Sequence, residues 1–205
     1  FEDGDSAYLS RTPSSAGNRR TWTFSCWAKR CTNAASGSSP SQVLFCGGNK
    51  QVIEFTATDD LLFQNYAPPY ANELIRTNAK YRDPSAWYHV VVVWDTTDST
   101  ADDRIRLYVN GEQVTSMQLR TNPALNLEGV INDTVQHTVG SRAIPSNYMD
   151  GYLAEVHFID GTALTPASFG QTDAATNQWK PIEATGLTYG TNGFYLKFVS
   201  GAIGT

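Results

Sequence analysis

The densest group of side chains able to do chemistry is an acidic loop that follows an apolar run. Four aspartates fall within the segment DTTDSTADD: Asp95, Asp98, Asp102 and Asp103. Ca²⁺ takes about six to eight oxygen ligands, so clustered loop carboxylates indicate a calcium site. Calcium is the candidate cofactor, the pair Asp59-Asp60 is a second location for it, and no other cofactor is expected. The alternative is a solvated acidic loop that discourages edge-to-edge association of sheets.

Catalytic groups are sparse, and the acidic residue that most needs testing is Glu155. It lies in the run AEVHFID, where His157 shares its face of a strand and Asp160 falls on the opposite face. Glycosidases need two carboxylates flanking the scissile bond, and this run supplies one. No Gly-x-Ser-x-Gly nucleophile turn occurs. We expect the three histidines to be packed or hydrogen-bonded, because each lies in a predicted strand: His89, His137 and His157. The prediction is therefore a protein without enzymatic activity.

Loop tyrosines beside amide side chains are the candidate sugar-binding residues. Lectin-like sites stack sugars on exposed aromatic rings with polar groups nearby. Tyr66 and Tyr70 flank the stiff pair Pro68-Pro69, and Tyr148 follows Asn147. The alternative is that these tyrosines cover the ends of the fold or pack on a neighbouring subunit.

The composition argues against nucleic-acid binding, membrane insertion and disorder. The formal net charge is −5, whereas a nucleic-acid binder is expected to be basic. No apolar run approaches the ~18 residues of a membrane span. Aromatic residues make up 12% of the chain, which is too many for a disordered protein. Three cysteines without a Cys-x-x-Cys pair predict free thiols in a reducing compartment.

Short strands must position these residues, because helical patterning is almost absent. Thr21–Arg30 alternates, and Trp87–Trp94 is apolar on both faces, which is typical of a central strand covered on both sides. Asn110-Gly111 predicts a two-residue hairpin turn, and Thr165–Gly170 predicts the only helical turn. The expected core residues are Phe24, Val90, Val92, Leu107, Val156 and Phe158, together with Trp22, Trp27, Trp87 and Trp94.

The arrangement of these strands predicts a two-sheet sandwich. Roughly ten to thirteen strands without βα alternation favour two antiparallel sheets packed face to face. A length of 205 residues fits one domain, here residues 1–205. The chain begins FEDGDSAYLS without an initiator Met and closes FVSGAIGT beside a strand-like run, so we expect it to be cut from a longer polypeptide.

Four segments in order carry a family resemblance: WTFSCWAKR, WYHVVVVWD, RIRLYVNGEQV and GYLAEVHFIDGTALTPASFG. The chain resembles laminin-G-like domains of the concanavalin A-like lectin/glucanase superfamily. Specifically, it resembles those of tailed-bacteriophage structural proteins, in tail fibres, spikes or capsid-surface proteins. The resemblance covers nearly the whole chain and implies an all-β, two-sheet antiparallel jelly-roll sandwich. It also implies calcium at the rim of the sandwich, and first and last strands side by side in one sheet.

The resemblance implies a non-enzymatic structural and adhesion module on the virion surface, decorating a capsid or forming part of a tail fibre. Such a module is made in the host cytoplasm, present as a homo-oligomer or in many copies, and in contact with other virion proteins. Host-surface or environmental glycans are the expected ligands, bound weakly and strengthened by copy number. Nucleic acid and membrane are not expected partners. The alternative is a secreted bacterial carbohydrate-binding or glycan-hydrolysing domain.

Removing Phe194–Phe198 should destabilise the protein, because this run is the predicted partner of Ala7–Ser10. Burying Phe194, Leu196 and Phe198 contributes roughly 1.5–3 kcal/mol per side chain. Thermal unfolding of the truncated and full chains measures the loss. Equal melting temperatures would contradict a structural role for the last strand.

Overall fold

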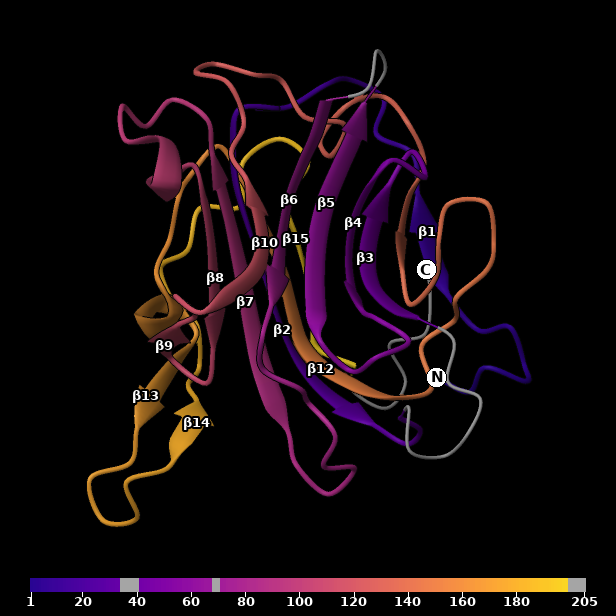
Figure 1. Ribbon diagram of the computed structural model, residues 1–205, viewed down its shortest axis with the longest axis vertical. Helices are drawn as coiled ribbons and strands as arrows, with labels where there is room; N and C mark the ends of the chain where they lie inside the picture. Colours follow the sequence, from indigo (N-terminus) through magenta and orange to yellow (C-terminus); the bar gives the residue numbers. More distant parts are fainter. Residues whose placement is uncertain (34–40, 68–70, 199–205) are drawn as a thin grey trace.

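The computed structural model describes residues 1–33, 41–67 and 71–198, apart from the side chains of residues 67, 71 and 72. Within this part of the chain two antiparallel sheets pack face to face, as Figure 1 shows. The predicted all-β sandwich is therefore confirmed. No helix among the described residues is long and apolar enough to cross a membrane.

The sheets have seven and six strands, and a separate two-stranded hairpin lies beside the second sheet (Figure 1). The seven-stranded sheet has the order β1 (Leu9–Arg11), β11 (His137–Val139), β3 (Gln42–Gly47), β4 (Gln51–Phe55), β5 (Leu61–Ala67), β6 (Ala71–Thr77), β10 (Met117–Thr121). The six-stranded sheet has the order β15 (Phe194–Leu196), β12 (Gly151–Asp160), β2 (Thr21–Arg30), β7 (Tyr88–Asp95), β8 (Ile105–Val109), β9 (Glu112–Gln113). The hairpin pairs β13 (Gly170–Thr172) with β14 (Trp179–Pro181).

The core between the sheets follows the predicted alternation. Along β2, every second side chain from Trp22 to Ala28 points into it. Trp22 stacks on Trp94 of the neighbouring β7, with ring centroids 6.3 Å apart. The six core residues expected from strand alternation are all buried in this cluster, which confirms them: Phe24, Val90, Val92, Leu107, Val156 and Phe158.

The cysteines are free thiols in three different settings. Cys26 lies in the core between the sheets, and its burial raises the pKa of the thiol far above its usual range. Cys46 belongs to a small apolar cluster with Val43 and Val52 on the outer face of the seven-stranded sheet, and Cys31 is exposed. Cys26 and Cys46 therefore lie in different sheets and face different sides, which rules out a bridge between them.

Both predicted turns form, and the structure contains one further turn that was not expected. Asn110 and Gly111 adopt φ of +50° and +86°, as a two-residue hairpin turn between β8 and β9 requires. The predicted helical turn is η3 (Pro166–Ser168), with Pro166 in its first turn. The expectation of a single helical turn is wrong, because the acidic loop forms a second one, η2 (Ala101–Asp103). It closes through i→i+3 bonds from the N–H groups of Asp103 and Arg104, which satisfy backbone groups in a short connection.

The predicted pairing of the first and last strands is wrong. Strand β1 pairs with β11, while β15 pairs with β12 in the other sheet. Each is the edge strand of its sheet, and they meet across the edge of the sandwich, where the Arg11 guanidinium donates to the carbonyl of Asn192 at 3.2 Å. Phe194 and Leu196 pack against the core from β15, so this strand still contributes apolar burial.

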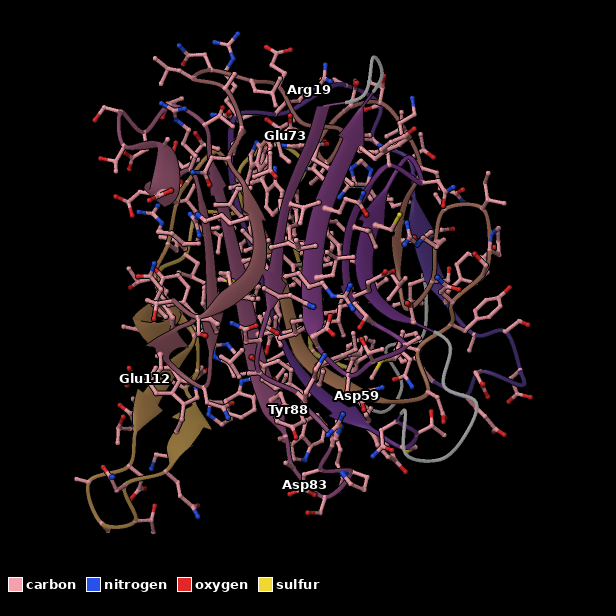
Figure 2. The ribbon with its side chains drawn as sticks, viewed as in Figure 1. Arg19, Asp59, Glu73, Asp83, Tyr88 and Glu112 are labelled. Carbon is pink, nitrogen blue, oxygen red and sulfur yellow. The ribbon has the colours of Figure 1, made fainter. Side chains whose placement is uncertain are left out.

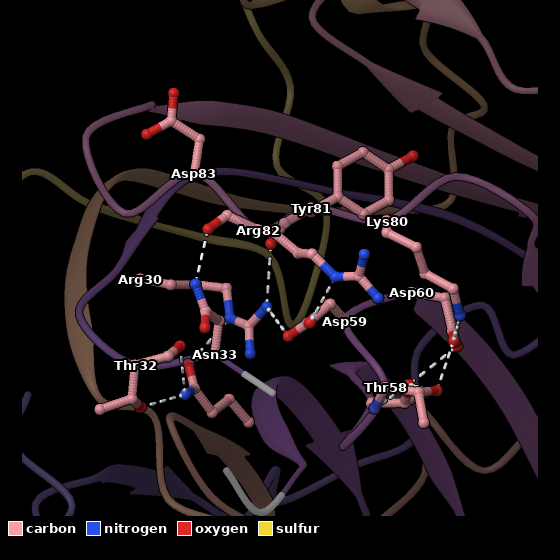
Figure 3. Close-up of polar contacts among 12 residues, drawn as sticks. Arg30, Thr32, Asn33, Thr58, Asp59, Asp60, Lys80, Tyr81, Arg82 and Asp83 are labelled. Atoms are coloured by element: carbon pink, nitrogen blue, oxygen red, sulfur yellow. Dashed lines mark hydrogen bonds and ion pairs between the residues drawn. The ribbon is translucent and has the colours of Figure 1, made fainter. Parts of the chain in front are cut away.

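A buried ion-pair network ties the two sheets together at one end of the sandwich (Figure 3). Arg30, at the end of β2, is 1% exposed and pairs with the fully buried Asp59 at 2.9 Å. Asp59 lies in the turn between β4 and β5, so this contact crosses from one sheet to the other. Its second carboxylate oxygen accepts from Arg82 at 3.0 Å.

Asp60 is held in the same way by two further cations. Its oxygens lie 2.6 Å from Arg76 Nε and 2.5 Å from Lys80 Nζ. Burial favours a higher pKa for Asp60, but hydrogen bonds from Arg76 and Lys80, with those from two threonines, outweigh it and hold the pKa well below its usual range. Basic side chains thus pair with the carboxylates of Asp59 and Asp60, so calcium at this second location gains no support from the geometry and stays a prediction.

Arg30→Met should lower the free energy of unfolding by about 3–5 kcal/mol, because it leaves a buried carboxylate short of a partner. Arg20→Met is the matched control. Arg20 pairs with Glu128 at 3.0 Å on the surface, where both side chains are nearly half exposed, so its loss should cost under about 1 kcal/mol. Urea unfolding of both variants measures the difference. Equal losses would contradict a structural role for the cross-sheet pair.

Candidate functional site

The outer face of the six-stranded sheet is partly covered by a third layer. Val91 and Val93 of β7 point outward, and with Ile159 and Phe169 they form a second apolar cluster. Residues of the later chain pack on this cluster, among them Leu164, Leu187 and Tyr189. The prediction that this strand is covered on both sides is thus confirmed, and the cover reaches only part of the face.

Beside this cover lies a cleft of about 870 Å³ between the sheet and the β13–β14 hairpin, here called the hairpin cleft. Its residues come from β2, β12, the loop before β7, the β8–β9 turn and the hairpin. Aromatic rings, amides and charged groups line it: Trp27, Trp87, Trp179, Asn110, Asn177, Gln178, Glu112, Glu155 and Lys180. Glu112 is seen next to the hairpin in Figure 2. The cleft combines flat apolar surfaces with hydrogen-bonding groups, as sugar sites do.

An exposed aromatic pair stands at the edge of the hairpin cleft. Trp87 is 40% exposed and Tyr152 is 59% exposed, and their ring centroids are 6.5 Å apart. The prediction that Trp87 is a core residue is wrong, because β7 begins at Tyr88 and Trp87 belongs to the preceding loop. The two rings thus form a contiguous exposed aromatic surface beside the cleft.

A β-bulge turns Glu155 toward the hairpin cleft. The pairing of β12 with β2 slips by one residue between Ala154 and His157, and Glu155 adopts a φ of +48°. A non-glycine residue in this conformation is strained, and such strain is concentrated at functional sites. The Glu155 carboxylate accepts a 2.5 Å hydrogen bond from the Tyr195 hydroxyl and lies 3.8 Å from His157 Nε2.

Trp179 fastens the hairpin to the sheet. Its indole N–H donates to His89 Nδ1 at 2.9 Å, so the proton of the neutral imidazole must be on Nε2, which donates to Ser25 Oγ at 2.9 Å. The His89 ring is stacked between Trp27 and Trp179, with centroids 4.9 and 5.9 Å away. Both ring nitrogens are used, so His89 anchors a wall of the cleft and is not free to act as a base.

The other two histidines are also packed and bonded, as predicted. His137 Nε2 accepts from the backbone N–H of Asn132 at 2.8 Å, and His157 Nδ1 lies 2.9 Å from the Tyr189 hydroxyl. Burial lowers the pKa of both rings below the ordinary imidazole value. All three histidines are therefore neutral at neutral pH.

Two glycines make room for Trp179. A Cβ on Gly111, in the β8–β9 turn, would lie 2.6 Å from the Trp179 ring, and so would a Cβ on Gly170. The Asn110-Gly111 turn thus has two functions, because Gly111 supplies the positive φ of the hairpin and the space for the indole. Trp179 thus docks its own hairpin on the six-stranded sheet.

The structure does not bring the predicted sugar-binding tyrosines together. Tyr66 is 41% exposed at the end of β5, where its N–H bonds to the carbonyl of Lys50 just beyond β3. Tyr148 packs against Tyr8 near the start of β3, since the adjacent Asn147 accepts from the N–H of Val43. Tyr70 lies outside the described residues. Tyr66 and Tyr148 therefore sit at opposite ends of the same sheet.

Three of the four predicted calcium ligands are bonded to nearby groups through their carboxylates: Asp95, Asp98 and Asp102. Asp95 Oδ1 accepts from the hydroxyls of Thr21 and Thr97, and Asp98 Oδ1 accepts from the N–H of Thr100. Asp102 is 77% exposed beside Arg120, and Asp103 lies with it in η2. In the described part of the chain, no three His, Cys, Asp or Glu side chains are grouped so that they could hold a metal ion. Calcium at Asp95, Asp98, Asp102 and Asp103 gains no support from this geometry and stays a prediction.

Sequence reasoning missed the residues of the hairpin cleft because they come from distant segments. Trp87, Glu112 and Trp179 are separated by long stretches of chain, and no spacing rule connects them. One signal was present. Trp27 falls between the inward-facing positions of β2, so its ring points to the outer face, where it is buried beside the cleft and not in the core between the sheets, where we expected it.

The comparisons agree with this fold. The family model of the concanavalin A-like lectin/glucanases superfamily matches residues 3–168. No curated protein sequence matches the chain significantly.

Three solved structures illustrate the likeness. A heptameric SAP-like pentraxin from Limulus polyphemus has 16% identity and a TM-score of 0.51, covering 77% of this chain and 71% of its own. The CBM40 domain of Ruminococcus gnavus IT-sialidase, bound to α2,3 sialyllactose, has 14% identity and a TM-score of 0.51, covering 78% and 94%. Domain 4 of the arabinanase AbnA from Geobacillus stearothermophilus, in complex with arabinotriose, has 16% identity and a TM-score of 0.50, covering 73% and 65%. At these identities the likeness concerns the fold.

Lowering the pH should destabilise the protein through His89. Burial lowers its pKa to about 3, below the ordinary value of about 6.5, so the folded state resists protonation and the unfolded chain does not. The stabilisation is complete above about pH 6.5 and is lost as the pH falls toward 3. Between pH 7.5 and 5 the free energy of unfolding should fall by about 2 kcal/mol. Urea unfolding at these two pH values measures it, with His89→Gln as the comparison. Equal pH dependence in both proteins would show that His89 does not titrate in this way.

Proposed function

Because the chain belongs to the concanavalin A-like lectin/glucanases superfamily, we propose that it is a non-enzymatic glycan-binding module whose site is the hairpin cleft. The observation that carries the proposal is the exposed aromatic pair of Trp87 and Tyr152 at the edge of a cleft rich in amides. The apolar face of a sugar ring packs on such rings, while its hydroxyls bond to amide side chains. Asn110, Asn177 and Gln178 supply both donors and acceptors for these hydroxyls.

Two of the structural neighbours support a glycan as the ligand class. The R. gnavus domain is bound to α2,3 sialyllactose, and the G. stearothermophilus domain is in complex with arabinotriose. These sugars differ in charge and size, so the fold accommodates several glycan classes. The identity of the ligand must then come from the groups of this chain's own cleft.

We propose that the module works as part of a tailed-bacteriophage structural protein, in a tail fibre, spike or capsid-surface protein. The support is the resemblance of its four segments to such modules. The free thiols agree with assembly in a reducing host cytoplasm. Many copies on a virion, held by other virion proteins, would multiply weak single-site affinities for host-surface or environmental glycans.

Glycan hydrolysis is the competing function, because two carboxylates, Glu112 and Glu155, line the hairpin cleft. We favour binding over hydrolysis because three indole rings and three amide side chains, groups that hold a sugar without cleaving it, line the cleft beside the two carboxylates. Incubation with laminarin and agarose, followed by assay of released oligosaccharides, separates the two functions. Product release that Glu155→Gln abolishes would establish a hydrolase instead.

Trp87→Ala should weaken binding of a glycan identified on an array by at least tenfold, or about 1.4 kcal/mol, because it removes the main stacking surface. Isothermal titration calorimetry measures the affinity. Tyr8→Ala is the matched control, since Tyr8 is also an exposed ring, 37% accessible, but belongs to the other sheet edge. Loss of binding in Tyr66→Ala or Tyr148→Ala, with Trp87→Ala unaffected, would place the site on the seven-stranded sheet and contradict the proposal.

A further inference from the structure

The charges of the hairpin cleft are unbalanced. Glu112 and Glu155 both line it, and of the described lining residues Lys180 alone is cationic. The ammonium of Lys180 lies 2.5 Å from a carboxylate oxygen of Asp173, on the same hairpin. The cation is thus neutralised within the hairpin, while two carboxylates face the cleft.

Neither cleft carboxylate has a cationic partner of its own. Over the described ranges, Glu112 and Glu155 make no ion pair with lysine or arginine. The nearest titratable base to Glu155 is His157 at 3.8 Å, and burial lowers the pKa of that ring to about 4, so it is neutral near pH 6. Burial and the Glu155 charge together raise the pKa of the hydroxyls of Tyr189 and Tyr195. Glu155 therefore has no positively charged side chain as a partner among the described residues.

The aromatic groups around these carboxylates suit a cation as well as a sugar ring. The faces of tryptophan and tyrosine rings attract an ammonium group, with tryptophan the strongest. Trp87 is exposed at the cleft, and Trp27 lines it with only 7% of its surface exposed. The Trp27 indole N–H is buried and has no hydrogen-bond partner among the described residues.

We propose that the hairpin cleft selects its glycan by charge and takes a sugar that carries a protonated amino group. The ammonium lies between the carboxylates of Glu112 and Glu155, and the sugar ring lies on Trp87. An N-acetylated sugar has no positive charge for the carboxylates to attract, so it binds more weakly. A sugar bearing a carboxylate or sulfate is repelled. This selectivity rests on the proposed glycan-binding function and adds the chemical class of the ligand.

Binding of two matched trisaccharides tests the selectivity. Chitotriose carries free amines and tri-N-acetylchitotriose is neutral, so calorimetry at pH 6 compares charge on one sugar backbone. We expect chitotriose to bind at least tenfold more tightly, and raising the salt from 0.05 to 0.5 M to narrow the ratio, because salt screens the attraction. Trp87→Ala should weaken the binding of both trisaccharides.

Single-carboxylate variants assign the effect to the cleft. Glu112→Gln and Glu155→Gln should each weaken chitotriose binding several-fold, and the double variant should bring the two trisaccharides to within about twofold of each other. Glu128→Gln is the matched control. Glu128 is exposed and lies far from the cleft, because the carbonyl of the preceding Leu127 accepts from Thr96 at the other end of β7. Loss of the Glu128 charge should therefore leave the ratio of the two trisaccharide affinities unchanged.

Two results would overturn the inference, and they differ from failure of the proposed function. Equal or tighter binding of tri-N-acetylchitotriose, sensitive to Trp87→Ala, would leave a glycan site without charge selection. A preference for chitotriose that survives in the double variant would place the selecting charge elsewhere. If neither these trisaccharides nor a broad panel of neutral and acidic glycans bind in a Trp87-dependent way, the glycan-binding function itself fails.

Discussion

The architecture depends on one pairing, that of β2 with β7, whose strands bury apolar side chains on both faces. Inward, Phe24 pairs with Val92 in the core, and outward, Val91 and Val93 form a second apolar cluster. A sheet with two apolar faces cannot leave one face open to water. The chain after β12 therefore has to return over the outer face as a third layer. The hairpin cleft lies beside this layer, so the cleft is a consequence of how the sandwich is covered.

Trp179 holds the β13–β14 hairpin in a defined position beside that third layer. Its hydrogen bond to His89, its stacking on the same ring and its fit against Gly111 fix the hairpin at one position on the sheet. A wall held by a buried donor–acceptor pair is preorganised, so a ligand does not have to order it on binding. The strained bulge at Glu155 adds a carboxylate on the opposite side. The fold thus brings together groups contributed by five separate parts of the chain.

Acidic residues have two contrasting roles in this protein. Asp59 and Asp60 are fully buried and paired with Arg30, Arg76, Lys80 and Arg82, and among these pairs that of Arg30 with Asp59 joins the two sheets. The carboxylates of the hairpin cleft, Glu112 and Glu155, make no ion pair with lysine or arginine among the described residues. A buried carboxylate without a cation would destabilise the fold, whereas one beside a solvent-filled cleft is tolerated. The presence or absence of an arginine or lysine partner therefore distinguishes the carboxylates that stabilise the fold from those of the cleft.

Local pattern alone determined much of the fold. The alternation along β2, the apolar run of β7 and the Asn110-Gly111 turn specify strands, an inner face and a hairpin, because a strand has a period of two residues and a tight turn needs positive φ. Only the tertiary structure decided which sheet receives each edge strand, and it separated β1 from β15. It also decided that Trp87 is exposed and that it shares a cleft with Trp179 and Glu155. These contacts join residues far apart in the chain, and their free energy depends on the packing of whole layers, which no local pattern records.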